Sequence, residues 1–361
     1  MSEKIRWKQV FISGGAIMGS MVGAGFASGQ EVMQFFTHLG FHRSIGAGFI
    51  SMLMLSWIFM TILEDGRKYQ FPNTNAIFAH YCGKKIGFFF EWFVPILMLM
   101  VFSMMISAAG ATFHEHYGFH PSVGRVVVAI FALLTVLLGM KRLAAIVGSV
   151  APLFIGLTIF IGFASISANP EGIADSNQVL ASIEVPSAYG HWLISGIMYA
   201  AFLMVGFMPF TAQIGKQAHS RKDTILGGLF AGVFFLSGAM ILSTGLLVNI
   251  DQVYHRQIPS LAIASASIPL AATLFALLMI AGIYTASVSM LWTAVNRIEG
   301  NDQSSRYRKV AIFLTLFAFI GGQLPFATMV GLIYPTIGYL GLILAGGMAY
   351  TKIKEVLPYY E

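Results

Sequence analysis

The chain has few charged residues and a single cysteine. Only 10% of its 361 residues are Asp, Glu, Lys or Arg, whereas 57% are hydrophobic and the mean hydropathy is +0.77. A soluble domain of this composition would expose large apolar surfaces, so we expect an all-α integral membrane protein. Because Cys82 is the only cysteine, an intrachain disulfide and a thiolate metal cluster are both excluded.

Several function classes lack their sequence signature. The net charge is +6, but the basic residues are scattered between apolar stretches and do not gather on one soluble face, so we expect no nucleic-acid partner. No phosphate-binding loop, Ser/His/Asp arrangement or pair of carboxylates lies within an apolar stretch. We therefore expect no enzyme and no cofactor except a candidate sodium ion. Any transport would have to be driven by an ion gradient or by exchange.

The apolar stretches predict about ten transmembrane helices. The first follows the polar segment Met1 to Lys8 and ends in no small-residue cleavage site, so we interpret it as a span and not as a signal peptide. Pro259 and Pro269 predict a loop helix on the outer side at the start of the eighth. The ten stretches cover approximately residues 9 to 37, 45 to 63, 87 to 113, 123 to 139, 143 to 167, 188 to 215, 224 to 249, 262 to 297, 309 to 321 and 326 to 350.

The basic residues predict the orientation of these spans. With the amino terminus in the cytoplasm, 18 of the 21 lysines and arginines fall on the inner side. Only Arg43, Arg125 and Arg256 fall outside, which agrees with the positive-inside rule. An error of one span would move every later loop to the other side and remove this asymmetry. We expect a multi-pass protein of the cell membrane with both termini in the cytoplasm.

The spans divide into two halves of five. Residues 1–168 form the first half, residues 169–187 an outer loop, residues 188–352 the second half and residues 353–361 a cytoplasmic tail. Because five is odd, the halves must be inverted relative to each other, as in many secondary transporters. Glycines from Gly23 to Gly29 predict a break in span 1, and Gly206 with Pro209 predicts a break in span 6. Broken helices at corresponding positions are typical of a binding site.

This pattern carries a family resemblance. The chain resembles the five-plus-five inverted-repeat transporters of the LeuT type, in the amino acid, polyamine and organocation superfamily, over residues 9 to 350. Its segment Gly23-Ala24-Gly25-Phe26-Ala27-Ser28-Gly29-Gln30-Glu31 is most similar to that of the small bacterial YkvI-type membrane proteins. The resemblance implies transport of a small solute, but it does not define the solute.

The two predicted breaks supply candidate substrate-binding residues. Backbone amides from about Gly25 to Gln30 open the outer half-helix, and a helix amino terminus attracts a carboxylate such as that of an amino acid. The alternative is that small residues here only permit close helix packing. The substrate candidates are Gly23, Ala24, Gly25, Phe26, Ser28 and Gly29 in span 1 and Tyr199, Phe202 and Gly206 in span 6.

Glu31 is the only acidic residue well inside an apolar stretch. A charge at membrane depth costs at least ~2.5 kcal/mol, so such a residue is a functional candidate. It could accept a proton in a coupled cycle, pair with a substrate amine, or act in a gate. The alternative is that Glu31 lies shallow enough to reach water on the outer side.

A candidate sodium site joins span 1 to span 8. Thr285 and Ser289 are four residues apart and share a helix face, so their hydroxyls could bind sodium together with carbonyls freed around Val22 and Gly23. LeuT-type proteins have such a site between these two spans, which the resemblance extends to this chain. The alternative is that both hydroxyls bond to their own helix.

Together these features predict an ion-coupled secondary transporter of a small zwitterionic or cationic organic solute, such as an amino acid or a related amine. Its partners would be this solute and the lipid bilayer, and the residues indicate no oligomeric state. The alternatives are an uncoupled exchanger, a channel or a membrane sensor with the same fold.

Overall fold

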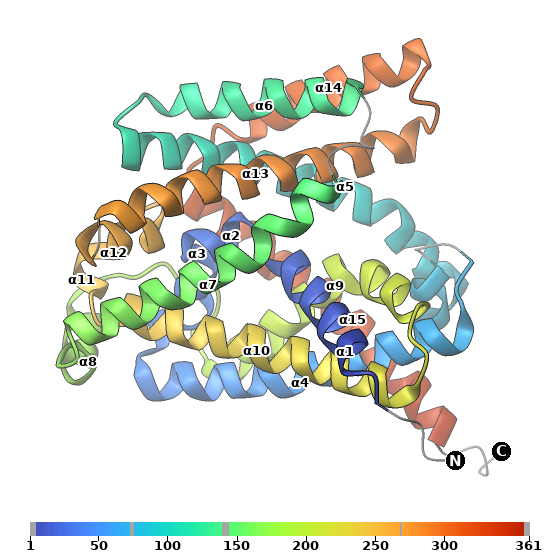
Figure 1. The fold of residues 1–361 in the computed structure, drawn as a ribbon, viewed down its shortest axis with the longest axis horizontal. Coiled ribbons are helices and arrows are strands. Elements are labelled where there is room, and N and C mark those ends of the chain that lie inside the picture. Colours follow the sequence, from blue (N-terminus) through green and yellow to red (C-terminus); the bar gives the residue numbers. More distant parts are fainter. Residues whose placement is uncertain (1–4, 73–75, 139–143, 268, 357–361) are drawn as a thin grey trace.

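The computed structural model describes residues 5–72, 76–138, 144–267 and 269–356, and every element within these ranges is a helix (Figure 1). This confirms the all-α prediction. In chain order the helices are α1 (Trp7–Met21), α2 (Ala24–Ser28), α3 (Gln30–Phe35), η1 (Thr37–Leu39), α4 (Phe41–Tyr69), α5 (Ala76–Tyr117), α6 (Pro121–Leu138), α7 (Ala144–Ala168), α8 (Gly172–Ser182), α9 (Trp192–Gly215), α10 (Arg221–Leu247), α11 (Ile250–Val253), α12 (Pro259–Ser267), α13 (Pro269–Ile298), α14 (Ser305–Gly321) and α15 (Phe326–Val356).

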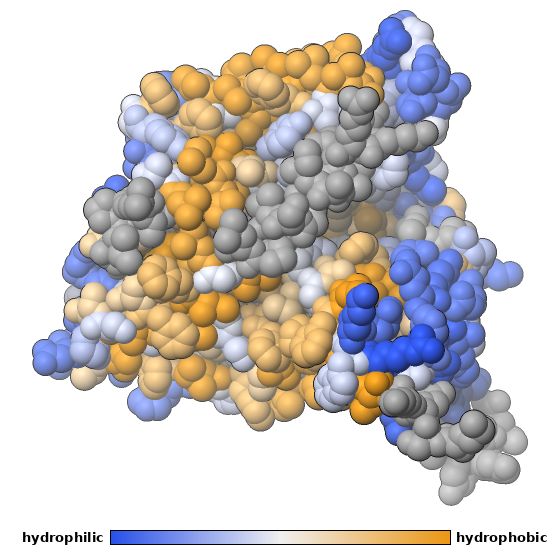
Figure 2. All heavy atoms as spheres, viewed as in Figure 1, coloured by the Kyte–Doolittle hydropathy of each residue, from blue (hydrophilic) through white to orange (hydrophobic). Residues whose placement is uncertain are grey.

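Seven helices in the described ranges are long and apolar enough to cross a membrane. Each of the ten predicted apolar stretches overlaps one or more helices, but the count of ten spans and the inverted repeat stay predictions. Large apolar side chains cover much of the surface (Figure 2), as expected for contact with lipid. The chain is a multi-pass membrane protein. The seven helices are Phe41–Tyr69, Ala76–Tyr117, Pro121–Leu138, Trp192–Gly215, Arg221–Leu247, Ala272–Ile298 and Phe326–Glu355.

The prediction of a broken span 6 is wrong. Trp192–Gly215 forms one helix, α9, with Pro209 inside it. Proline removes one backbone hydrogen bond, but the helix continues through it because the neighbouring turns keep theirs. The start of the predicted loop helix corresponds to α12 (Pro259–Ser267), but residue 268, where it would end, lies outside the described residues, and its position on the outer side stays a prediction.

The helices pack into two groups (Figure 1). In the first group α4 lies against α9 and α10, and α1 packs on α10. In the second group α5 packs against α6, α13 and α14. Helix α15 belongs to neither group alone, because it contacts both α9 and α5. The α4–α9 contact is close and reciprocal: a Cβ on Gly66 would collide with the carbonyl of Ala212, and one on Gly215 with the carbonyl of Leu63. Such backbone contacts fix α4 and α9 as one unit.

Polar contacts join segments that the charge pattern assigns to the same side. The amide of Arg6, before α1, donates to Asp223 at the start of α10 over 2.9 Å, and both are predicted to be on the inner side. Asn169 Nδ2, in the side chain, donates to the carbonyl of Val248 over 2.6 Å, and both residues are predicted to be on the outer side. These contacts agree with the predicted sidedness of the helix ends, whereas the assignment of one side to the cytoplasm stays a prediction.

Candidate functional site

The first apolar stretch is interrupted at two points. α1 ends at Met21, Val22 and Gly23 depart from helical geometry, and α2 begins at Ala24. Gly29 is the second interruption, with a φ of 82° between α2 and α3. This left-handed backbone favours glycine, whereas the extended backbone of Gly23, with φ −105° and ψ −178°, accepts other residues. The predicted break between Gly23 and Gly29 is therefore confirmed.

Many backbone groups in this segment are bonded within it. The amide of Ala27 donates to the Gly23 carbonyl and the amide of Gly29 to the Phe26 carbonyl, over 2.9 and 3.0 Å. The hydroxyl of Ser28 donates to the carbonyl of Gly25 over 2.9 Å. Some of the backbone amides and carbonyls that we predicted to bind a substrate therefore already form hydrogen bonds within the segment. The role of this segment in substrate binding stays a prediction.

Glu31 lies in the first turn of α3 and is 3% exposed. The alternative that its carboxylate reaches outer water is therefore wrong. The hydroxyl of Tyr199, on α9, donates to Glu31 Oε1 over 2.6 Å. This bond joins the two stretches in which the sequence predicted a binding site.

The second carboxylate oxygen faces Gly25 and Tyr334. A Cβ on Gly25 would lie 2.7 Å from Glu31 Oε2 and would collide with the hydroxyl of Tyr334, which comes from α15. The missing side chain at Gly25 therefore makes room for a carboxylate and a phenol side by side. We call Gly25, Glu31, Tyr199 and Tyr334 the carboxylate cluster.

Aromatic rings surround the carboxylate cluster on the α9 side. Phe202 stacks on Tyr334, with ring centroids 4.7 Å apart and an interplanar angle of 13°. Phe36 packs edge-on against Tyr199 at 4.7 Å. Phe26, which we also predicted to bind substrate, instead packs against Phe235 of α10, with ring centroids 4.9 Å apart. Tyr199 and Phe202 thus lie together at the site, whereas the contacts of Phe26 lie toward α10.

Two buried glutamines hold the outer end of α3. Gln34 Nε2 donates to Gln30 Oε1 and to the carbonyl of Ala327, both over 2.9 Å. Gln30 Nε2 donates to the carbonyl of Arg256 over 2.5 Å. The amide of Ala327 in turn donates to Gln257 Oε1 over 2.9 Å. These bonds connect α3 to α15 and to the loop before α12, so the site is closed on this side, which the charge pattern predicts to be the outer one.

The side of the site next to α1 is less tightly packed. All residues from Ala24 to Thr37 are buried, whereas Val22 and Gly23 are half-buried. A Cβ on Gly23 or on Gly206 would meet no atom within 4 Å. Unfilled space therefore borders the first break and the second half of α9.

The candidate sodium ligands on α13 bond to their own helix. Thr285 Oγ1 donates to the carbonyl of Gly282 over 3.0 Å, and Ser289 Oγ donates to the carbonyl of Thr285 over 3.2 Å. A hydroxyl that donates its hydrogen keeps its lone pairs, so this arrangement is compatible with a cation. A Cβ on Gly282 would also meet no atom within 4 Å. The sodium site with Val22 and Gly23 stays a prediction.

Sequence reasoning missed Tyr334, Gln30 and Gln34. The two glutamines carried a signal, because polar side chains four residues apart in an apolar stretch share a helix face. Tyr334 carried little signal, since the chain has 13 tyrosines and α15 is distant from span 1 in sequence.

Comparisons with known proteins agree with these observations. The chain is 24% identical over 344 residues to the uncharacterized membrane protein YkvI of Bacillus subtilis, covering 93% of this chain and 94% of YkvI. It is 21% identical over 335 residues to the uncharacterized protein YyaD of the same organism, covering 91% and 92% of the two chains. The predicted resemblance to YkvI-type proteins is confirmed. No family model matches the chain.

The fold is similar to that of solved transporters. The inward-facing conformation of Mhp1 matches with a TM-score of 0.60 and 11% identity, over 94% of this chain and 75% of Mhp1. A Na⁺-coupled sialic acid symporter matches with a TM-score of 0.60 and 13% identity, over 96% and 78%. MhsT in complex with L-phenylalanine matches with a TM-score of 0.60 and 15% identity, over 97% and 89%. The chain has the fold of these transporters.

Proposed function

We propose that the protein is a secondary transporter of a small zwitterionic or cationic organic solute, such as an amino acid or a related amine, and that an ion gradient drives it by alternating access. The fold supports transport, and the interrupted first stretch supports a binding site at its break. The half-buried Val22 and Gly23 beside unfilled space, opposite the closed outer end of α3, support a state accessible from the α1 side.

The observation that carries this proposal is the burial of Glu31. Glu31 is only 3% exposed, so water does not solvate its carboxylate. None of the ion pairs among the described residues includes Glu31. An ionised carboxylate without a cation costs several kcal/mol in such surroundings. Glu31 must therefore bind a proton or a cationic group at some stage of a transport cycle.

The surroundings of Glu31 favour the proton in this state. Tyr199 occupies one carboxylate oxygen, and Gly25 with the Tyr334 hydroxyl encloses the other. An ammonium group needs space beside the carboxylate that this packing leaves out. We therefore propose that Glu31 carries a proton while the outer side is closed, and that a substrate amine or water reaches it when α3 separates from α15.

Sodium coupling is the second candidate. Unfilled space beside both Gly23 and Gly282 favours it, because a cation between span 1 and α13 would lie near the hydroxyl of Thr285. Proton and sodium coupling make different predictions for uptake, so transport measurements separate them.

The test begins with a thermal-shift screen of the purified protein against amino acids and biogenic amines, with and without sodium. Uptake of the stabilising compounds into proteoliposomes is then measured under separate proton and sodium gradients. Concentrative, saturable uptake under one gradient supports the proposal. Flux that does not saturate indicates a channel, full activity with neither gradient indicates an exchanger, and binding without flux indicates a sensor.

A further inference from the structure

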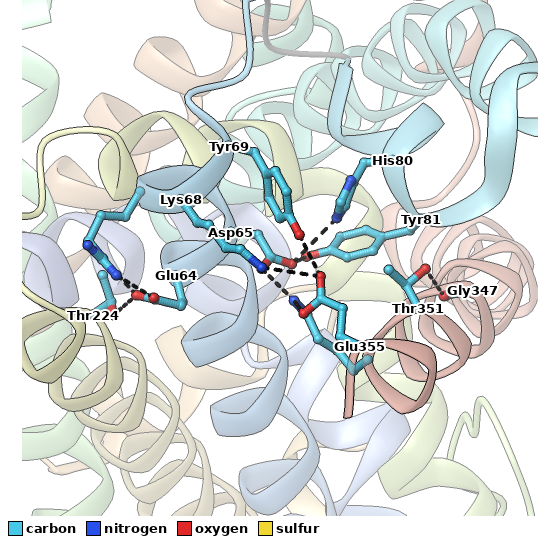
Figure 3. A network of polar contacts seen from close by, with 12 residues as sticks. Glu64, Asp65, Lys68, Tyr69, His80, Tyr81, Thr224, Gly347, Thr351 and Glu355 are labelled. Carbon is cyan, nitrogen blue, oxygen red and sulfur yellow. Dashed lines mark hydrogen bonds and ion pairs between the residues drawn. The ribbon is translucent and has the colours of Figure 1, made fainter. Parts of the chain in front are cut away.

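A second polar network, shown in Figure 3, lies at the ends of α4 and α15, which the charge pattern assigns to the inner side. Its centre is Asp65, near the end of α4, which is fully buried. Lys352 Nζ, from α15, donates to Asp65 Oδ1 over 2.5 Å, and the hydroxyl of Tyr81, from α5, donates to Asp65 Oδ2 over 2.5 Å. Three helices therefore meet at one carboxylate.

Further polar groups surround this centre. Glu355 accepts hydrogen bonds from Lys352 Nζ over 3.0 Å and from the hydroxyl of Tyr69 over 2.6 Å. Lys68 Nζ lies 3.8 Å from Glu355 Oε1, and His80 Nε2 lies 3.9 Å from Asp65 Oδ2. The end of α15 is thus bonded to the end of α4 through several groups.

Tyr81 belongs to a short separate piece of α5. Gly83 has a φ of 74°, which divides residues 76–82 from the rest of α5. This piece also packs closely against α15, because a Cβ on Gly347 would lie 2.6 Å from Cys82 Sγ and 2.9 Å from the carbonyl of Tyr81. The end of α15 therefore packs directly over Cys82 and the carbonyl of Tyr81.

The bonds to Asp65 connect α4 of the first helix group to α5 of the second and to the end of α15. α4 is fixed to α9, which carries Tyr199 and so contacts Glu31, whereas α5 packs in the group with α6, α13 and α14. A movement of α5 relative to α4 must stretch or break the bond of Tyr81 to Asp65, and a movement of the end of α15 away from α4 must break the bond of Lys352 to Asp65. By contrast, the 3.6 Å contact between Arg297 and Glu91 joins α13 to α5 within a single group and would persist.

We propose that Asp65, Lys352 and Tyr81 form an inner latch, which holds the end of α15 against both α4 and residues 76–82 and sets the balance between conformations in the transport cycle. The inference rests on the proposed transport function for its role, but the latch itself is detectable without a substrate. Asp65 and Lys352 act as positioning residues, since neither contacts the carboxylate cluster in the structure.

The single cysteine is a native reporter for this latch. Cys82 is half-buried beside Gly347, so its thiol should become accessible when the end of α15 moves away. The experiment measures the rate of Cys82 modification by N-ethylmaleimide in the full chain in lipid nanodiscs. The variants are Lys352→Gln, Asp65→Asn and Tyr81→Phe, with Glu91→Gln as the matched control.

We expect labelling roughly tenfold faster in Lys352→Gln and Asp65→Asn, the factor that loss of a charged hydrogen bond corresponds to. Tyr81→Phe should give a smaller increase, and Glu91→Gln should label at the wild-type rate. Because Asp65 and Lys352 act on each other, the double variant should label no faster than the faster single variant. Wild-type rates in all three latch variants would overturn the proposal. Tyr81→Phe, which removes only one hydroxyl, decides the question if the charge variants do not fold.

A reversible disulfide between α15 and residues 76–82 tests whether these segments must separate during transport or only stabilise the fold. In Gly347→Cys the new Cβ lies 2.6 Å from Cys82 Sγ and 2.9 Å from the Tyr81 carbonyl, so the end of α15 must shift slightly, and mild oxidation should then join α15 to residues 76–82. The reduced variant, and not the wild type, is the reference for uptake. Uptake of a compound identified by the thermal-shift screen should fall severalfold on oxidation and recover with a reductant. Full uptake by the oxidised variant would contradict the latch while leaving the proposed transport intact. Faster labelling in the charge variants of a protein that shows no uptake would contradict transport alone.

Discussion

The hydroxyl of Tyr199 donates a 2.6 Å hydrogen bond to Glu31 Oε1, across 168 positions of sequence. It links the interrupted first stretch to α9, the helix in which we placed the second half of the predicted site. The bond lies at a buried carboxylate without an ion-pair partner among the described residues, so changes to either residue should alter coupling before they alter the fold.

Glu31→Gln should abolish concentrative uptake but permit exchange of solute. A permanently neutral side chain resembles one protonation state and cannot alternate between two. Uptake into proteoliposomes under a proton gradient, and counterflow without a gradient, measure the two activities. Glu91→Gln is the control, since Glu91 pairs with Arg297 away from the site. Normal proton-driven accumulation by Glu31→Gln would show that Glu31 carries no coupling proton.

Tyr199→Phe should lower the free energy of unfolding by about 1–3 kcal/mol, because the buried Glu31 Oε1 loses its donor. The same substitution in a Glu31→Leu background should cost less, because the side chain at position 31 then offers no oxygen to the Tyr199 hydroxyl. Thermal unfolding of the four proteins in detergent gives this cycle. Equal costs in both backgrounds would mean that the two side chains do not interact.

Gly25→Ala should impair binding and transport while the protein still inserts into the membrane. The added methyl group would lie 2.7 Å from Glu31 Oε2 and collide with the Tyr334 hydroxyl. Adding Tyr334→Phe removes that hydroxyl and should restore part of the activity. Gly15→Ala is the matched control, because Gly15 lies in α1 outside the predicted site and a Cβ there meets no atom within 4 Å. Ligand-induced thermal shifts check this series, and equal losses in both glycine variants would refute the steric argument.

If sodium drives transport, Thr285→Ala and Ser289→Ala should each weaken the sodium dependence of uptake, since each removes one oxygen ligand. Thr293→Ala is the control, because Thr293 also donates to its own helix, to the carbonyl of Ser289 over 2.8 Å. The sodium concentration giving half-maximal uptake is the measurement. An unchanged value in both variants would exclude these hydroxyls as ligands.

The predicted topology can be tested directly. A reporter fused after Pro170 should report the outside of the cell, and one fused after Asp302 should report the cytoplasm, as the distribution of basic residues requires. The opposite result at either position would overturn the count of spans.

The sequence alone determined the features that depend on local chemistry. Composition and hydropathy identified an all-helical membrane protein, because unbonded backbone groups are not tolerated in lipid. The glycines from Gly23 to Gly29 predicted the interruption, since the left-handed backbone of Gly29 favours a residue without a side chain. The isolated Glu31 indicated a site, because a charge at membrane depth is costly.

Only the tertiary structure decided which distant residues meet at these positions. Pro209 predicted a break in span 6, but α9 is a single helix packed against α4 and α15. The partnership of Glu31 with Tyr199 and Tyr334, and of Asp65 with Lys352 and Tyr81, depends on how α9, α15 and α5 pack around α3 and α4. Helix packing follows the shape of whole helix faces, and a hydropathy pattern records which residues are apolar but not which faces meet.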